Sequence, residues 1–314
     1  MDKVTIIGAG NVGATIAMKI FEKDLADIAL IDVVEGLAKG KALDIKESAP
    51  IKGHNANICG YTKDYSAAEG SDIVIITAGI TRKPGMSRDD LLSKNMQIVE
   101  DVVKKVVKFA SESILIIVSN PLDAMCHVAY EVSGFQRERI IGMAGVLDSI
   151  RFCTFIAEEL NISVENVQAI VLGGHGDSMV PLPRYTTVCG VPIIQLINKD
   201  KIEKLIKRTR EGGAEIVSLL KTGSAYYAPA AATVEMVEAI LKDKKKILPC
   251  SVLLKGEYGI EDIFLGVPVK LGQKGAEDII EIDLNREEIE ALHNSAEHVR
   301  RLVEKMKQLR TNRA

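Results

Sequence analysis

The chain lacks the cysteine and histidine patterns of metal sites and disulfide frameworks. Its five cysteines are odd in number and include no Cys-x-x-Cys pair or other zinc-ligand spacing. His293 and His298 are five residues apart in a helical pattern, which is the wrong spacing for one helix face. We therefore expect no metal site, and we expect reduced, buried thiols in a cytoplasmic protein.

Long apolar runs and an excess of charge are also missing. No run approaches the ~20 residues that a membrane-spanning helix needs. The opening MDKVTIIGAG enters an apolar run at once, so we expect no signal peptide. The net charge is −3 and the pI is about 6.0, so no overall field attracts nucleic acid or an anionic membrane. We expect neither partner.

The first half instead alternates apolar runs with helical patterns. The runs are almost continuously apolar, as in strands that are buried on both faces of a parallel sheet. This repetition predicts an α/β fold with a doubly wound parallel (Rossmann) sheet. The expected strands are 3–10, 27–32, 71–79 and 113–120, and the expected helices are 11–23, 35–48, 88–110 and 122–133.

The second half changes character near residue 144. Helices are expected at 147–160 and 198–220, whereas 246–272 suggests short antiparallel strands broken by glycine and proline. A long final helix is expected to begin at the N-cap Asn285, with Glu288 completing a capping box. With 314 residues, we expect two domains: a Rossmann domain at 1–143 and an α+β substrate domain at 144–314.

A glycine motif follows the first expected strand. Gly8, Gly10 and Gly13 have the G-x-G-x-x-G spacing, which allows a tight turn, a close approach of a pyrophosphate, and helix packing on the strand. The helix N-terminus then offers free N–H groups to phosphates. A glycine-rich turn that serves only the fold is the alternative. The candidate cofactor-binding residues here are Gly8, Ala9, Gly10, Asn11, Val12 and Gly13.

Asp32 supplies the second part of this fingerprint. It ends the next expected strand, about 20 residues after the glycines, where a carboxylate can bind the ribose hydroxyls of adenosine. It would repel a 2′-phosphate, and the stretch DVVEGLAKG contains no arginine to neutralise one. The pattern therefore predicts NAD rather than NADP.

Three further residues form a candidate reactive centre. His175 lies between glycines in VLGGHGDSMVP, and Asp148 could accept a hydrogen bond from one imidazole nitrogen and leave the other for proton transfer. Arg151 follows Asp148 by three residues, so the two could form a simple helical ion pair. Alternatively, Asp148 turns to His175 while Arg151 binds a substrate carboxylate. Asn120 follows a strand at the edge where ligands bind, although asparagine is also a common turn residue before proline.

Arg82, Lys83 and Arg88 concentrate positive charge in the loop TAGITRKPGMSRDD. Because the chain as a whole is slightly acidic, this charge points to a local anion. Arg88 could instead pair with Asp89 or Asp90.

The stretches GAGNVG, TAGITRKPGMSR, VSNPLDAM, GMAGVLDSIRF and LGGHGDSMVP resemble the 2-hydroxy-acid dehydrogenases that include lactate and malate dehydrogenases. The resemblance runs over essentially the whole chain. It implies His175 as the acid/base paired with Asp148, Arg151 as the carboxylate clamp, and Asn120 as a substrate donor beside the nicotinamide. It implies Arg88 as a catalytic, substrate-binding residue on a closing loop. Further implied cofactor contacts are Asn95, Val118, Ser119 and Asn120.

Within the family that the sequence resembles, the residue at position 82 distinguishes lactate-type from malate-type members. Lactate-type members carry Gln there, whereas an arginine calls for a second carboxylate, which implies malate and oxaloacetate as small-molecule substrates. Lactate dehydrogenase activity is the nearest alternative, and an NAD-binding sensor is the non-enzyme alternative. Short-chain dehydrogenases need a Tyr-x-x-x-Lys pair, which the sequence lacks. The resemblance also implies a homodimer or homotetramer.

Overall fold

A continuous mixed sheet forms the centre of the molecule. The computed structural model describes residues 1–53, 55–80 and 87–311, and within them nine strands form one sheet in the order β14-β13-β12-β6-β5-β4-β1-β2-β3. Strands β1 to β6 are parallel, and β12 to β14 continue the sheet in antiparallel register. The strands are β1 (Lys3–Ile7), β2 (Asp27–Asp32), β3 (Ile58–Thr62), β4 (Ile73–Ile76), β5 (Ile114–Ile117), β6 (Ile140–Gly142), β12 (Lys246–Lys255), β13 (Glu261–Gly272) and β14 (Gly275–Ile279).

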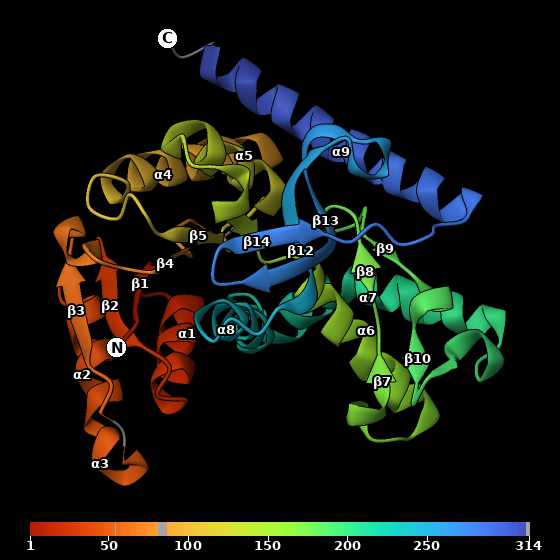
Figure 1. Ribbon diagram of the computed structural model, residues 1–314, viewed down its shortest axis with the longest axis horizontal. Helices are drawn as coiled ribbons and strands as arrows, with labels where there is room; N and C mark the ends of the chain where they lie inside the picture. Colours follow the sequence, from red (N-terminus) through yellow and green to blue (C-terminus); the bar gives the residue numbers. More distant parts are fainter. Residues whose placement is uncertain (54, 81–86, 312–314) are drawn as a thin grey trace.

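Helices cover both faces of this sheet. Figure 1 shows α4 and α5 on one side with α9 beyond them, and α1 with α8 on the other side. The order of the parallel strands, β3-β2-β1-β4-β5-β6, is that of a doubly wound dinucleotide-binding sheet. The helices are α1 (Asn11–Glu22), α2 (Leu37–Glu47), α3 (Ala49–Lys52), α4 (Arg88–Val106), α5 (Leu122–Ser133), α6 (Gly145–Leu160), α7 (Lys199–Leu220), α8 (Tyr227–Leu241) and α9 (Arg286–Thr311).

Two small antiparallel sheets lie beside α6 and α7. One contains β7 (Val167–Gln168), β10 (Thr187–Val188) and β11 (Val191–Pro192), and the other contains β8 (Val171–Leu172) and β9 (Val180–Pro181). Their residues pack around a separate small core that includes Phe152 and Ile156 of α6. The second half of the chain is therefore α+β.

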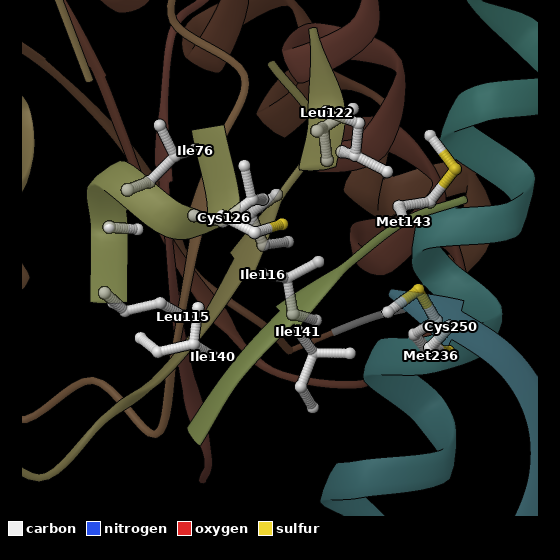
Figure 2. Close-up of a cluster of buried hydrophobic side chains, with 14 of the residues drawn as sticks. Ile76, Leu115, Ile116, Leu122, Cys126, Ile140, Ile141, Met143, Met236 and Cys250 are labelled. Carbon is white, nitrogen blue, oxygen red and sulfur yellow. The ribbon is translucent and has the colours of Figure 1, made fainter. Parts of the chain in front are cut away.

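The main core joins the two halves of the chain. All residues of β4 and β5 are buried, because helices cover both sheet faces. Figure 2 shows Ile116 and Ile141 of the parallel strands close to Met236 of α8 and Cys250 of β12. One connected cluster of buried side chains extends from Val4 to Met306. The division at 143/144 stays a prediction.

The predicted antiparallel strands in 246–272 are confirmed, but the prediction that they are short is wrong. This segment contains two long strands, β12 and β13, and GEYG is the turn between them. Gly266 and Pro268 lie inside β13 rather than ending it. Gly266 is required because its N–H and C=O bond to Gly173 at 3.1 and 2.8 Å, and an added Cβ would lie 2.6 Å from the Gly173 oxygen.

The start of the final helix matches its sequence pattern, whereas three other elements were not predicted. Asn285 and Glu288 form the expected capping box, with each side chain accepting the other's backbone N–H at 2.9 Å. The sequence patterns gave no prediction of β3, β6 or α8. All five cysteines are free. Among the described residues, no helix is long and apolar enough to span a membrane, and no cluster of His, Cys, Asp and Glu could hold a metal.

Candidate functional site

The glycine turn lies between β1 and α1, at the carboxyl end of the central strands. Gly8 has a φ of 106°, which an L side chain rarely adopts. A Cβ at Gly13 would lie 1.8 Å from the Gly8 oxygen, so Gly13 allows α1 to pack against the turn. A Cβ at Gly10 would meet no atom within 4 Å. The space above Gly10 and the first-turn N–H groups of α1, where Asn11 and Val12 lie, fit a pyrophosphate.

Asp32 lies beside this turn and is held in place by two backbone groups. One carboxylate oxygen accepts the N–H of Ala9 at 2.6 Å, and the other accepts the N–H of Val34 at 2.9 Å. The Lys41 Nζ donates to the Ala9 carbonyl at 2.8 Å, which braces the turn from α2. The residues present therefore fit an adenosine ribose next to a phosphate-binding turn.

His175 and Asp148 meet, as the sequence could only suggest. The Nδ1 of His175 lies 3.0 Å from an Asp148 carboxylate oxygen, and this bond places a proton on Nδ1 and leaves Nε2 available. Burial alone would lower the pKa of His175, but the charge and hydrogen bond of Asp148, together with the charge of Asp123, outweigh it and raise that pKa. The pair is suited to hold and release a proton.

Arg151 lies next to this pair. Its NH1 is 3.4 Å from the second oxygen of Asp148, so Asp148 contacts both His175 and Arg151. Only 12% of the Arg151 side chain is exposed, and its buried Nε has no hydrogen-bond partner among the described residues. Burial lowers the pKa of Arg151 while Asp148 opposes the change, and a guanidinium stays charged. An oxyanion would supply the missing partner.

The ends of β4 and β5 form the next wall of the site. Ser119 Oγ donates to the carbonyls of Ile76 and Ala78, which fixes the backbone before Asn120. Asn95 is 2% exposed, and its amide nitrogen donates to the carbonyls of Asn120 and Ile80 at 2.7 and 3.1 Å. The Asn120–Pro121 peptide is cis.

A cavity of about 400 Å³ brings these groups together. Val12 of the glycine turn lines it along with Val118, Asn120, Arg151 and His175. A larger hollow of about 910 Å³ opens near Asp72, Glu112 and Arg139, at the amino ends of β4, β5 and β6. The smaller cavity is the candidate active site because it holds the proton-carrying pair and the buried guanidinium.

The loop cations are the part of the prediction that the structure leaves open. Arg82 and Lys83 lie outside the described residues, as does the side chain of Arg88, whose backbone begins α4. The two acids proposed as alternative partners of Arg88 have other contacts. Asp90 forms a capping box with Ser87, and Asp89 pairs with Lys305 at 2.7 Å.

Comparison with known proteins identifies the family. Residues 2–142 match the lactate/malate dehydrogenase NAD binding domain, and residues 145–310 match the lactate/malate dehydrogenase alpha/beta C-terminal domain. The chain belongs to the lactate/malate dehydrogenase family. It is an NAD-dependent oxidoreductase of that family, as its sequence resemblance predicted.

Individual members of this family are similar over nearly their full length. The malate dehydrogenase of Chlorobium limicola is 57% identical over 295 residues, which cover 94% of this chain and 95% of that one. The structure of malate dehydrogenase from Salinibacter ruber is 52% identical with a TM-score of 0.95, covering 99% and 100%. A lactate dehydrogenase from Cryptosporidium parvum, complexed with lactic acid and NAD, is 42% identical with a TM-score of 0.94, covering 98% of each chain.

The sequence patterns did not identify four polar residues that lie near the site. Lys41 braces the glycine turn, and Arg210 of α7 lines the cavity and donates to the Met179 carbonyl at 3.2 Å. Asp123 and Ser251 form a buried hydrogen-bonded pair behind His175. VSNPLDAM contains Asp123, but nothing in that stretch separates it from any aspartate in a first helical turn.

Proposed function

We propose that this chain is an NAD-dependent malate dehydrogenase that interconverts (S)-malate and oxaloacetate. The malate dehydrogenases of Chlorobium limicola and Salinibacter ruber are each more than half identical to it over nearly the whole chain. The observation that carries the proposal is the contact between His175 and Asp148 beside Arg151, whose buried Nε has no hydrogen-bond partner among the described residues. These groups suit a substrate with a hydroxyl and a carboxylate on adjacent carbons.

Each residue has one task in this mechanism. Arg151 binds the C1 carboxylate of malate, and Asn120 donates a hydrogen bond to the C2 oxygen. His175 accepts the hydroxyl proton at Nε2, and Asp148 stabilises the imidazolium that results. The glycine turn and Asp32 would hold NAD, which would supply the acceptor for the hydride of C2. In the reverse direction, His175 donates its proton to the carbonyl oxygen of oxaloacetate.

The two loop arginines complete the proposal. Arg82 binds the second carboxylate of the substrate, and Arg88 stabilises negative charge on the carbonyl oxygen as it develops. The sequence resemblance supports both roles. Interactions that strengthen as the loop excludes water would favour the transition state.

Steady-state assays with NADH test this proposal directly. Oxaloacetate and pyruvate should be compared at several concentrations, and kcat/KM should be higher for oxaloacetate. Faster reduction of pyruvate would favour the lactate dehydrogenase alternative. Binding of NADH without turnover of either acid would favour the sensor.

We also propose a homodimer or homotetramer in the cytoplasm, with a Rossmann domain at 1–143 and a substrate domain at 144–314. Large apolar side chains on several helices support self-association, including Ile51 at 89% exposure and Leu219 at 74%. Free cysteines support a reducing compartment. Sedimentation velocity on the purified chain would give the assembly size.

A further inference from the structure

A second carboxylate is buried behind the candidate proton carrier. Asp123, in the first turn of α5, is 4% exposed. One of its oxygens accepts the backbone N–H of His175 at 2.9 Å, and the other accepts the Ser251 hydroxyl at 2.7 Å. It therefore joins three segments that are remote in sequence: the start of α5, the turn that carries His175, and β12.

The turn around His175 is shaped to this carboxylate. A Cβ at Gly174 would lie 2.8 Å from a Val299 methyl group, 3.2 Å from the Ser178 hydroxyl and 3.3 Å from the Asp123 oxygen that binds His175, so a glycine lets the turn approach all three. The Gly174 N–H is bound separately by Ser295 of α9 at 2.8 Å. Successive backbone N–H groups of the turn are thus fixed by α9 and by α5.

The surroundings of Asp123 favour its ionised form in part and oppose it in part. Burial raises the pKa of Asp123 above that of a free aspartate, and the charge of Asp148 adds to the rise. The hydrogen bonds from Ser251 and His175 and the charge of His175 oppose this rise without cancelling it. The N-terminus of α5 also favours a negative charge. Both oxygens accept hydrogen bonds, which suits a carboxylate.

We propose that Asp123 is a positioning residue for His175, because it fixes the backbone of the turn and adds a second negative charge beside the ring. Among the described residues, the charges that act most on His175 are those of Asp148 and Arg151 from α6 and Asp123 from α5. Asp177, Arg210 and Glu211 line the same cavity. Those near Asp123 are His175 and Asp148, with the thiol of Cys126 on its own helix. Asp123 thereby raises the pH up to which His175 keeps its proton. The inference rests on the proposed function of His175.

Asp123→Asn tests this role because it keeps the size and an acceptor oxygen but removes the charge. NMR titration of imidazole carbons in the free protein, with the His175 signal assigned from His175→Asn, should give a lower His175 pKa in Asp123→Asn than in the wild-type chain. The pH limbs of kcat/KM for oxaloacetate reduction and malate oxidation should both move down by a similar amount.

Glu238→Gln is the matched control. Glu238 of α8 is also a buried carboxylate, paired with Lys23 and Lys244, and it belongs to neither the site nor the cofactor turn. It should lower thermal stability without moving the His175 titration. An Asp123→Asn protein whose activity falls equally at all pH values, with an unchanged His175 titration, would overturn the inference.

Ser251→Ala keeps the experiment decisive if Asp123→Asn does not fold. Removing this donor weakens the hold on Asp123, so we expect a smaller shift of the His175 titration in the same direction or an Asp123 with a higher pKa. An unchanged titration of both groups would overturn the inference. Failure of the proposed function is distinguishable, because the wild-type chain would then reduce pyruvate faster than oxaloacetate or turn over neither acid, while its NMR titration could still be measured.

Discussion

Asp148 is the residue that organises the site, because its two oxygens are divided between two cations. One contacts His175 at 3.0 Å and the other contacts Arg151 at 3.4 Å. The helical ion pair and the contact with His175, which were alternatives in the sequence, therefore occur together. The same carboxylate can orient the proton carrier and the proposed carboxylate clamp.

His175→Asn should separate cofactor binding from chemistry. The glycine turn and Asp32 are unchanged, so we expect the Kd of NADH from fluorescence titration to stay within about twofold of wild type. Loss of the proton carrier should reduce turnover of oxaloacetate by about 10²- to 10⁴-fold. Turnover close to wild type would remove His175 from the reaction.

Arg82→Gln should change the preferred substrate. Leaving a buried carboxylate without its cation costs roughly 2–5 kcal/mol, so kcat/KM for oxaloacetate should fall at least about 30-fold relative to pyruvate. Lys83→Gln is the control, because the resemblance gives Lys83 no substrate contact. An unchanged ratio of the two substrates in Arg82→Gln would contradict the proposed role of Arg82.

The sequence predicted the residues of the site, but it did not predict the residues that hold them in place. His175, Asp148, Arg151 and Asp32 lie in distinctive stretches, and the structure brings the first three together. Asp123 could not be recognised, because its partners are 52 and 128 residues away in the chain. Contacts at that separation depend on how the sheet, α5 and β12 assemble.

Secondary-structure elements were predictable where their apolar pattern is strong. The predicted and observed bounds of α5 coincide at residues 122–133. By contrast, β3 is a half-exposed edge strand that contains Gly60, and β6 has three residues. Most residues of α8 are buried, so this helix has no polar face. Its sequence therefore lacks the alternation of apolar and polar residues from which an exposed helix is predicted.

His127 of α5 contacts β13 and lies near two cations of α9, and it should make the stability of the protein depend on pH. Its Nε2 accepts the Phe264 N–H of β13 at 3.1 Å. Burial, with the charges of Lys307 and Arg300 on α9, lowers the pKa of His127 to about 4. The unfolded chain takes up this proton first, so stability is present above the unfolded pKa of about 6.5 and is lost as pH falls from there to about 4.

Urea denaturation at pH 7 and pH 5 would measure this effect. The His127 contribution predicts a loss of about 2 kcal/mol between the two values. His127→Gln keeps an acceptor for Phe264 but cannot titrate, so this part of the difference should vanish in the variant. An identical difference in both proteins would exclude His127 as its source.

At the scale of the whole molecule, the main core does not stop where the two family domains meet. The hairpin β12–β13 pairs with β6 through Ser251 and Gly142, and α8 packs against α1. The Lys23–Glu238 ion pair, at 2.5 Å, also joins α1 to α8. The first half alone would expose the side of α1 that packs against α8 and the edge of β6 that pairs with β12.

Residues 1–143 produced alone should therefore be unstable. We expect their thermal transition, followed by circular dichroism, to be broad and well below that of the full chain, because burial from α8 and β12 is missing. In the full chain, hydrogen exchange of β1 and β13 should report the same opening free energy. A fragment that melts sharply at the temperature of the full chain would contradict this expectation.

The pairing of β6 with β12 also limits how relatives can be recombined. A chimera that takes residues up to 143 from one parent and the remainder from another would combine residue 142 of the first parent with residue 251 of the second. An added Cβ at position 142 would come within 2.9 Å of the Ser251 Cβ and 2.6 Å of the Cys126 sulfur. Because residues 126 and 142 come from the same parent, a viable crossover needs a second parent whose residue at 251 leaves room for the first parent's residue at 142.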